Sequence, residues 1–407
     1  MPILSLVIPT RNRPTCVLDC VKVALANTED TEIIVSDNSD TDALRGQLLD
    51  LDSRGRIKYR YSEKKLNVID NFERVLDDCT GDYLMFIGDD DSIGPQIEAV
   101  AQWARDQNLD AVTSYGSAFV ANYFWPGVVS KYFGNAYAAS LFVNRCSGSV
   151  EATNPLEALR RVARNPGGGL GKLPRAYHGL VSRRLVSAVR AEFGCLFGGI
   201  SPDIYSATLI AARCKTAAHL DFPFVIPGAS PKSAAGLGAE RKDYGDLKGN
   251  DHIERFGDSL AWDDRIPRFN SPYTVWAYSL SKAIDQLPTI DLAPEFTRLY
   301  ACCFMYYPGH WRQTWIALCN HARTTSRIRA GLGFVRDFVL EIGSLLQRIV
   351  NKLRRSLNSQ LQSKVSNLPA ISDAYLALEV HLKSRGITPD LAPFRLGGQV
   401  SDHAQRS

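Results

Sequence analysis

The sequence predicts an α/β fold with a mostly parallel sheet flanked by helices, followed by a mainly helical C-terminal extension. Strand-like and helix-like segments alternate through the first part of the chain, and right-handed crossovers would place each helix on a face of the sheet. Three of the strand-like segments are nearly all apolar, as central strands of a parallel sheet are. No run of 18 or more consecutive apolar residues occurs, so we expect no transmembrane helix.

The individual elements are predicted from the spacing of apolar residues. Strand-like runs lie at residues 3–8, 32–36, 57–61, 83–87 and 111–115, and helical spacing occurs at residues 14–27, 41–51, 67–79 and 95–107. In the first of these helices, Val17, Cys20, Val21 and Ala24 fall three or four residues apart and define one apolar face. The alternation predicts a doubly wound sheet.

Polar residues follow the first four predicted strands, where open α/β sheets bind their ligands. They are residues 9–13, 37–40, 64–67 and 89–91. Asp89, Asp90 and Asp91 are adjacent carboxylates at the end of a buried strand, and their mutual repulsion indicates a divalent cation. The mixture of carboxylates, amides and cations suits a ligand with a base, a ribose and phosphates bridged by a metal. The simpler interpretation is that these loops are polar because loops generally are.

The next segments are less regular. Residues 123–127 are aromatic and end in glycine, and residues 167–172 are rich in glycine. The glycine-rich run is not a Walker A loop, because Pro166 and Leu173 stand where that loop needs Gly and Ser or Thr. We expect a mobile lid or a simple loop there. Ser201 as N-cap and Pro202 at the first helical position predict a helix with Asp203 in its first turn, where an acid also complements the helix dipole.

Between Arg323 and Arg355 the chain has eight basic residues and two acids. Five apolar residues recur at helical spacing in this segment: Phe334, Phe338, Ile342, Leu345 and Ile349. The pattern predicts a basic amphipathic helix, which either lies on an anionic membrane surface or packs its apolar side on the protein core.

Composition excludes several classes of protein. The 407 residues are 45% hydrophobic and 22% charged, which is typical of soluble globular proteins, and the net charge of +4 is too small to indicate a nucleic-acid partner. The nine cysteines are scattered without a CxxC pair, so we expect reduced thiols and neither a zinc site nor disulfides. The N-terminus has no positively charged leader, so we expect a cytoplasmic protein.

Three segments together resemble the family 2 glycosyltransferases, which have the GT-A fold. They are residues 6–13, residues 32–39, and residues 80–83 running into 88–91. The Gly-Asp-Asp-Asp form of residues 88–91 is similar to the bacterial subgroup that includes abequosyltransferase-like enzymes of surface-polysaccharide assembly. Motif order and spacing agree with the family across about 115 residues. The predicted divisions are a glycosyltransferase domain with a nucleotide-sugar-binding half and an acceptor-binding half, a helical extension and a basic C-terminal region: residues 1–240 (1–116 and 117–240), 241–322 and 323–407.

The resemblance implies the following donor site. Pro9, Thr10 and Arg11 line the nucleotide pocket, Asp37 accepts a hydrogen bond from the base, and Asp89 approaches the ribose. Asp90, together with Asp91, holds Mg²⁺ or Mn²⁺ against the diphosphate in a DXD-type motif, with Lys64 or Lys65 and Asn67 as helpers. The ion neutralises charge that develops on the leaving diphosphate.

Asp203 matches the general base that deprotonates the acceptor hydroxyl for in-line attack with inversion. This sequence departs from the family at Gly88, where many relatives carry the first aspartate of the acidic motif, so the register of the metal ligands stays open. Pro202 stands where an acidic residue is frequent. His219 and His252 are candidates for a third metal ligand, although lone histidines are more often structural.

The predicted function is therefore a metal-dependent, inverting transfer of one hexosyl or deoxyhexosyl group from a nucleotide diphosphate-sugar to a glycan or lipid-linked acceptor, in surface polysaccharide biosynthesis. The chain lacks the Gln-x-x-Arg-Trp motif of processive synthases, which favours a nonprocessive enzyme, peripheral on the inner face of the cell membrane. A sugar-nucleotide pyrophosphorylase would need a Gly-rich loop with a lysine after the first strand, and residues 9–14 do not provide one. A catalytically inactive nucleotide-sugar-binding or scaffold protein with the same fold is the second alternative.

Overall fold

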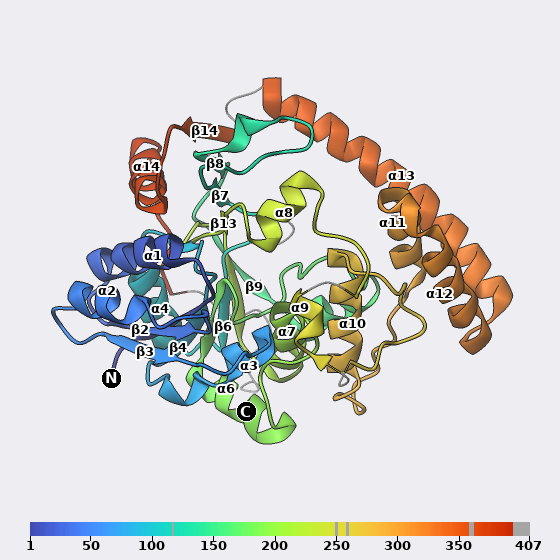
Figure 1. Cartoon of the computed structure of the whole chain (residues 1–407), viewed down its shortest axis with the longest axis horizontal. Coiled ribbons are helices and arrows are strands. Elements are labelled where there is room, and N and C mark those ends of the chain that lie inside the picture. The colour runs from blue at the N-terminus through green and yellow to red at the C-terminus, as the bar shows by residue number, and fades with distance from the viewer. Residues whose placement is uncertain (116–117, 249–250, 258–259, 358–361, 394–407) are drawn as a thin grey trace, which may run out of the picture.

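The computed structural model describes the whole chain except residues 116–117, 249–250, 258–259, 358–361 and 394–407 (Figure 1). Its centre is an eight-stranded sheet in the order β3-β2-β1-β4-β10-β6-β11-β9. The strands are β1 (Leu4–Thr10), β2 (Thr31–Asp37), β3 (Ile57–Tyr61), β4 (Tyr83–Phe86), β6 (Ala111–Thr113), β9 (Val150–Thr153), β10 (Gly179–Ser182) and β11 (Ala217–Leu220).

Most neighbours in this sheet are parallel. β1 pairs in parallel with β2 and β4, β2 with β3, and β6 with β11. β10 is antiparallel to both β4 and β6, and β9 is antiparallel to β11. The predicted α/β class with a mostly parallel sheet is therefore confirmed. Because β1, β2, β3 and β4 are parallel, their carboxyl ends lie along one edge of the sheet.

Helices cover both faces of the sheet. They are α1 (Pro14–Asn27), α2 (Leu44–Leu51), α3 (Val68–Glu73), α4 (Ile97–Asp106), α5 (Pro155–Ala163), α6 (Arg183–Phe193) and α7 (Pro202–Arg213). In β1, Leu6 and Ile8 pack in one hydrophobic core with α1, α2 and α4, whereas Val7 packs in a second core with α3, α5, α6 and α7. Successive side chains of a strand point to opposite faces, so this alternation is what a buried strand requires.

The helix predicted at residues 67–79 is divided. α3 ends at Glu73, and a short 3-10 helix follows at Leu76–Asp78. Between them Val75 has φ −104° and ψ 3°, outside the α-helical region. Val75 and Leu76 are buried in the second core, so tertiary packing prevails here over continuous helical spacing.

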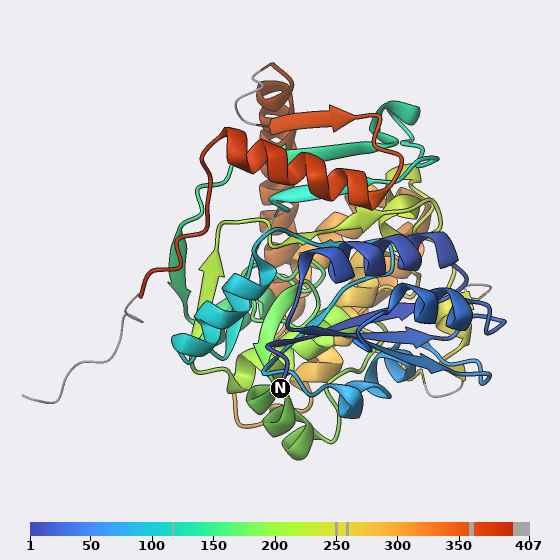
Figure 2. The same ribbon diagram turned by 90° about the vertical axis from the view of Figure 1, so that its left-hand side faces the viewer.

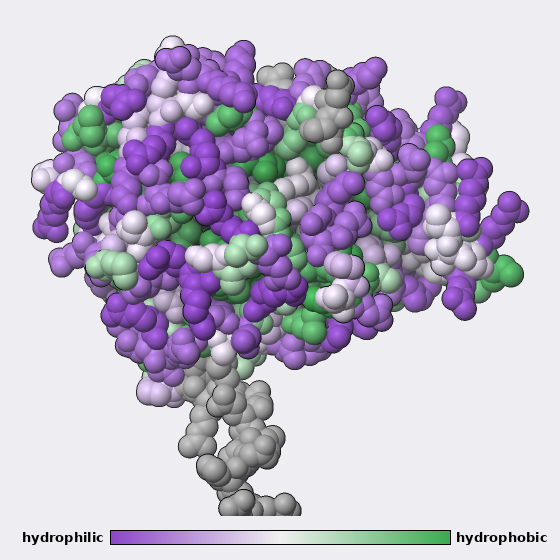
Figure 3. Space-filling view, turned by 90° about the horizontal axis from the view of Figure 1, so that it is seen from below, coloured by the Kyte–Doolittle hydropathy of each residue, from purple (hydrophilic) through white to green (hydrophobic). Residues whose placement is uncertain are grey.

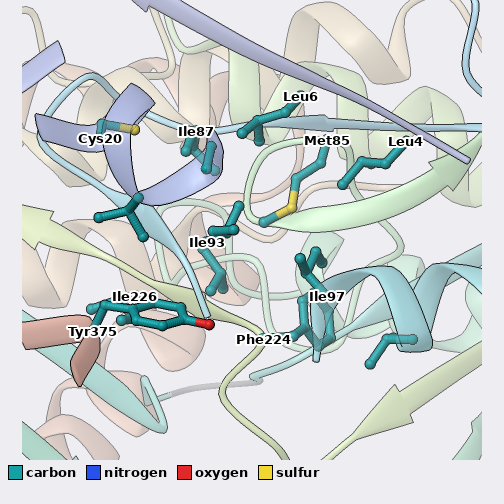
Figure 4. Close-up of a cluster of buried hydrophobic side chains, with 14 of the residues drawn as sticks. Leu4, Leu6, Cys20, Met85, Ile87, Ile93, Ile97, Phe224, Ile226 and Tyr375 are labelled. Carbon is teal, nitrogen blue, oxygen red and sulfur yellow. The ribbon is translucent and has the colours of Figure 1, made fainter. Parts of the chain in front are cut away.

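Two smaller sheets join distant parts of the chain. β12 (Val225–Ile226) pairs with β5 (Ser92–Ile93), and a four-stranded sheet has the order β13 (Gly228–Ala229), β7 (Ala121–Phe124), β8 (Ser140–Asn144) and β14 (Gln362–Ser366). β14 is followed by α14 (Ile371–Ser384), which lies beside this sheet (Figure 2). Tyr375 of α14 reaches the same core as Leu6, Met85 and Phe224 (Figure 4). The C-terminal part of the chain thus returns to the N-terminal domain.

Helix α8 (Ala234–Glu240) packs against the first core through Ala239. Further helices form a layer with a core of its own: α9 (Asp251–Glu254), α10 (Pro272–Ile284), α11 (Thr297–Tyr306), α12 (Trp311–Thr324) and α13 (Arg327–Leu357). Phe269, Phe296 and Tyr300 are fully buried in this core. The predicted helical extension is confirmed, whereas the exact domain limits stay a prediction. Within the residues described, no helix combines the length and apolar character needed to span a membrane.

Candidate functional site

The first and fourth strand ends meet in a network of short polar contacts. Thr10 at the end of β1 donates a hydrogen bond from Oγ1 to Asp89 Oδ2 at 2.6 Å. Arg13 forms an ion pair with Asp89, with 2.6 Å between Nη2 and Oδ1, and its Nη1 lies 3.4 Å from Asp90 Oδ1. Pro9 is buried in β1, and the Nε of Arg11 is buried without a hydrogen-bond partner among the described residues. That unused donor is available to a bound acceptor.

The second and third strand ends are joined in the same way. Asp37 is fully buried, accepts a hydrogen bond from the Ser39 backbone N–H at 2.8 Å, and lies 2.7 Å from the Tyr59 hydroxyl. Asn38 donates to the carbonyl of Lys64 at 2.7 Å, and the Lys64 side chain is exposed. The structure therefore brings all four predicted strand ends together at one edge of the sheet.

Asn67 and Arg255 hold the rim of this edge. Asn67 is the N-cap of α3, and its Oδ1 accepts a hydrogen bond from the Asp70 backbone N–H at 2.9 Å. Arg255 was not predicted as a site residue. Its Nη1 donates to the carbonyl of Leu66 at 2.6 Å and lies 3.1 Å from Asn38 Oδ1, so a residue next to α9 closes over the second and third strand ends.

The three adjacent aspartates have different surroundings. Asp89 is fully buried, and burial raises its pKa to about 7, against the opposing effect of the Arg13 charge and with a further increase from Asp90. Its two oxygens are engaged by Arg13 and Thr10. Asp89 is therefore a fixed part of the site wall.

Asp91 has partners on both oxygens. Oδ2 accepts a hydrogen bond from the Gly88 backbone N–H at 2.6 Å and lies 2.5 Å from His178 Nε2, and Oδ1 accepts from the Gly228 backbone N–H at 2.6 Å. Burial would raise the pKa of Asp91, but the charge and hydrogen bond of His178 and the two backbone N–H groups outweigh it and lower the pKa. This carboxylate is held in place by the protein.

Asp90 is the member of the triplet with an available oxygen. Its Oδ2 accepts a hydrogen bond from the Ser230 backbone N–H at 2.8 Å, whereas the nearest recorded partner of Oδ1 is Arg13 at 3.4 Å. A Cβ placed on Gly88 would lie 3.1 Å from Asp90 Oδ1 and 3.0 Å from Asp91 Oδ2, so two carboxylates converge in front of this glycine. Mg²⁺ is commonly bound by one or two carboxylates plus substrate phosphates, and this donor set fits that pattern.

No cluster of three or more His, Cys, Asp or Glu side chains suited to a metal occurs in the described part of the chain. His219 lies on β11, where its Nδ1 is 3.4 Å from Thr113 Oγ1 and its Nε2 is 3.9 Å from Glu151 Oε1. The side chain of His252 lies outside the described residues. A metal ion bound here would accordingly take most of its ligands from a bound substrate and from water.

Tyr177 and His178 belong to the site but were not predicted from the sequence. The two rings stack with centroids 4.2 Å apart, and His178 Nδ1 lies 2.8 Å from the Tyr115 hydroxyl. His178 has φ +61°, which is uncommon for a residue other than glycine. No local motif marks this pair, because it reaches Asp91 through the position of β10 next to β4.

Asp203 lies in the first turn of α7 and is partly exposed. Its Oδ1 accepts a hydrogen bond from the Ile204 backbone N–H at 2.7 Å and from the Ser201 hydroxyl, so Ser201 occupies the N-cap position but bonds the carboxylate and not the helix backbone. Burial of the carboxylate raises its pKa, and these hydrogen bonds partly oppose the effect.

A buried cation lies near Asp203. Arg175 has no exposed surface; its guanidinium donates hydrogen bonds to the carbonyls of Tyr115 and Gly171 and lies 4.2 Å from the centre of the Tyr115 ring. The negative charge of Asp203 favours the protonated guanidinium, while burial lowers the pKa of Arg175. Tyr115 thus connects the surroundings of Asp203 with His178 and, through it, with Asp91.

Comparison with known proteins agrees with the class that these features indicate. Residues 5–144 match the family model described as glycosyl transferase family 2. These residues carry all four strand ends, so the part of the chain that forms the candidate site is similar to this family, and the predicted enzyme class, a glycosyltransferase, is confirmed.

No curated protein matches the sequence significantly. Among solved structures, S. aureus TarS 1–349 in complex with UDP-GlcNAc is 13% identical, covers 83% of this chain and 89% of its own, and has a TM-score of 0.43. The mannosyltransferase PcManGT from Pyrobaculum calidifontis, in complex with GDP-Man and Mn2+, is 14% identical, covers 95% of this chain and 88% of its own, and has a TM-score of 0.38. The abequosyltransferase-like subgroup stays a prediction.

Proposed function

We propose that this protein transfers one sugar from a nucleotide diphosphate-sugar to an acceptor hydroxyl, with inversion and with Mg²⁺ or Mn²⁺. The observation that carries the proposal is the convergence of four strand ends at one edge of the sheet, with Asp90 Oδ1 left available among three buried aspartates. The unpartnered Nε of Arg11 at the same edge favours a ligand with acceptor oxygens, such as a base or a phosphate.

Asp90 is our candidate metal ligand, and Asp91 has a supporting role. A bound divalent ion would supply charge neutralisation for the diphosphate as it leaves. Asp90 is held by the Ser230 N–H through its other oxygen, so the free oxygen has a fixed direction. Asp91 positions the loop at Gly88 and the loop at Gly228 through their backbone N–H groups.

Asp203 is our candidate general base. Burial of its carboxylate raises its pKa, and this increases its affinity for the proton of an acceptor hydroxyl. A single displacement with the base on the side opposite the diphosphate inverts the anomeric carbon. A hollow of about 300 Å³ between α7 and α10, lined in part by Tyr205, Tyr278 and Lys282, is our candidate for part of the acceptor site.

We further propose that the acceptor is a glycan or a lipid-linked glycan of surface polysaccharide biosynthesis, and that the protein works at the inner face of the cell membrane. The alternative is an inactive nucleotide-sugar-binding protein with the same fold. It would bind a donor without turnover, and the intact Asp90 and Asp203 favour the enzyme over it.

The decisive experiment incubates the purified protein with a panel of nucleotide sugars, acceptor glycans and Mn²⁺, and measures released nucleoside diphosphate. Asp90→Asn should lose release and also lose the Mn²⁺-dependent rise in melting temperature with UDP or GDP. Asp203→Asn should keep donor binding and lose transfer. Asp106→Asn, an exposed α4 variant, is the matched control.

Full activity of Asp90→Asn in EDTA would refute the metal mechanism, and unchanged transfer by Asp203→Asn would remove it as the base. Donor binding by the native protein, with no release from any donor and acceptor in the panel, would favour the inactive alternative.

A further inference from the structure

The long helix α13 carries apolar side chains that face solvent. Figure 1 shows it along one side of the molecule, with α11 and α12 on its inner side. We define the outward stripe as six residues that alternate three and four positions apart: Leu332, Val335, Val339, Ile342, Leu346 and Ile349. Their exposed fractions run from 41% to 69%. At 100° per residue this spacing keeps all six on one side of the helix.

The stripe cannot simply turn inward, because the opposite side of α13 is fixed by buried charges. Asp337 and Glu341 are the only acids of the helix and are 4% and 2% exposed. Thr297 of α11 donates to Asp337 at 2.5 Å, and Tyr306 of α11 donates to Glu341 at 2.8 Å. Rotation of the helix would separate these carboxylates from their partners, and leaving a buried charge without its partner is unfavourable.

The sequence left open whether this helix packs on the core or faces outward. Phe334 and Phe338, two of the residues that suggested an amphipathic helix, are half-buried, and Phe334 packs against the core of the helical layer. Ile342 and Ile349 of the same set are exposed. The apolar surface of α13 is thus wider than the core contact uses, and the excess faces solvent.

Basic side chains flank the outward stripe on both sides. Arg329, Arg336 and Arg354 lie on one flank, Arg327 and Lys352 lie on the other, and all five are exposed. Arg336 also pairs with Asp337 at 2.8 Å and with Glu295 at 3.8 Å, so the other four are the main candidates for headgroup contacts. Lys352 also lies 4.0 Å from the ring centre of Phe133, an exposed aromatic residue of a neighbouring loop. An apolar stripe between cations, with both acids turned inward, matches the interface of an anionic bilayer.

A second copy of the chain fits this surface less well. The alternating spacing would suit a coiled coil, but two copies would bring their basic flanks together, and the two acids of α13 are buried on its opposite side. The stripe is also unlike the surface seen from below, which is mostly hydrophilic with scattered hydrophobic residues (Figure 3). A continuous apolar stripe therefore calls for a partner with apolar and anionic parts.

We propose that α13 docks this protein on an anionic lipid bilayer, lying flat with the outward stripe among the lipid chains and the flanking cations at the headgroups. The inference rests on the proposed function only for the location at a membrane, and it does not depend on the transfer chemistry. Trp311 and Trp315 on α12, which packs against α13, are about half exposed, and residues of this type favour a membrane interface.

The test measures co-sedimentation of the full chain with vesicles of phosphatidylcholine alone or mixed with phosphatidylglycerol, at low and high salt. The native protein should bind the anionic vesicles, and salt should weaken binding. The triple variant Leu332→Glu, Val339→Glu, Leu346→Glu should bind about tenfold or more weakly. The triple variant Leu49→Glu, Leu376→Glu, Val380→Glu is the matched control, because it changes the same residue types at exposed positions of α2 and α14 and should bind as the native protein does.

Equal binding to neutral and anionic vesicles, or equal losses in both triple variants, would overturn the proposal. A native dimer that the α13 variant alone dissociates, without vesicle binding, would assign the stripe to a second copy and also overturn it. The double variant Arg329→Gln, Arg354→Gln keeps the stripe and should weaken binding to anionic vesicles. Release of nucleoside diphosphate with a soluble acceptor should stay unchanged in the α13 triple variant, so a failure of the proposed transfer and a failure of docking give different results.

Discussion

Two adjacent aspartates should respond in opposite ways to the same isosteric substitution. We expect Asp91→Asn to destabilise the fold strongly and Asp90→Asn to leave its stability nearly unchanged. The reason lies in their partners: Asp91 is 2% exposed and accepts from the backbone N–H groups of Gly88 and Gly228 and contacts His178, whereas Asp90 accepts one hydrogen bond from Ser230.

The magnitude follows from counting donors around Asp91. An asparagine has one acceptor oxygen, so its amide NH₂ would face the N–H of either Gly88 or Gly228. The orphaned N–H costs about 1 to 3 kcal/mol, and the lost charge-assisted bond costs about 1.5 to 3 kcal/mol. Together these costs come to about 2.5 to 6 kcal/mol, a range that includes the roughly 3 to 5 kcal/mol that removal of one member of a buried charged pair generally costs. In Asp90→Asn the side-chain amide oxygen can still accept a hydrogen bond from the Ser230 backbone N–H. The free energy of unfolding should therefore change by less than about 1 kcal/mol.

The assay is urea unfolding of both variants in EDTA, followed by circular dichroism. EDTA removes any stabilisation by metal, so the difference reports the hydrogen bonds alone. The slope of the free energy of unfolding against urea concentration should be the same in the native protein and in both variants. The urea concentration at the unfolding midpoint should fall only in Asp91→Asn. Equal destabilisation by the two substitutions would refute the assignment of Asp91 to support and Asp90 to the available oxygen.

Two further predictions concern the loop at Gly228 and the helix α13. Gly228→Ala should destabilise the fold by about 3 kcal/mol or more in urea unfolding, because a Cβ there would lie 1.7 Å from the carbonyl oxygen of Asp90. Gly343→Ala on α13 is its control: it meets no atom within 4 Å and should stabilise the protein by about 0.5 to 1 kcal/mol. For Glu341, burial opposes ionisation, but hydrogen bonds from Tyr306, Arg348 and Arg298 lower its pKa. Its folded pKa lies below the unfolded value near 4.3, so its stabilisation is present above that pH and is lost as the pH falls through the folded pKa. The stability difference between the native protein and Glu341→Gln should therefore narrow as the pH falls below the unfolded pKa of about 4.3, and a constant difference would contradict this explanation.

The parts of the fold that were predictable have local signals. β1, β2 and β4 are short apolar runs that can be recognised without knowledge of the rest of the chain, and they follow the predicted strands within a few residues. β10 and β14 were not predicted. Each is a short strand paired across a long sequence separation, β10 with β4 and β14 with β8, and its local pattern does not specify that partner. The parallel crossovers could be inferred from the alternation of strands and helices in the sequence. The position of β10 between β4 and β6, antiparallel to both, could not.

The same distinction applies to the site. The strand ends were predictable because they follow apolar runs directly, and Asp203 because a motif resembles the family. Tyr177, His178 and Ser230 reach the aspartates only through tertiary structure, and they determine which carboxylate oxygen is available. The sequence could therefore indicate that a triplet of acids binds a cation, but it could not distinguish the member that does so from the two that are already satisfied.

That distinction changes how strongly a metal should bind. In the sequence, three adjacent carboxylates suggest a site with high negative charge. In the structure Arg13 neutralises Asp89, and His178 with two backbone N–H groups stabilises Asp91, so the protein offers a divalent ion essentially one oxygen of Asp90. A single carboxylate is a weak Mg²⁺ or Mn²⁺ site, and phosphate oxygens must complete it. Mn²⁺ alone should then raise the melting temperature little, and Mn²⁺ with UDP or GDP should raise it by more than the sum of the separate effects. A large stabilisation by Mn²⁺ without nucleotide, retained in Asp90→Asn, would mean that the ion binds elsewhere and that Asp90 is not its ligand.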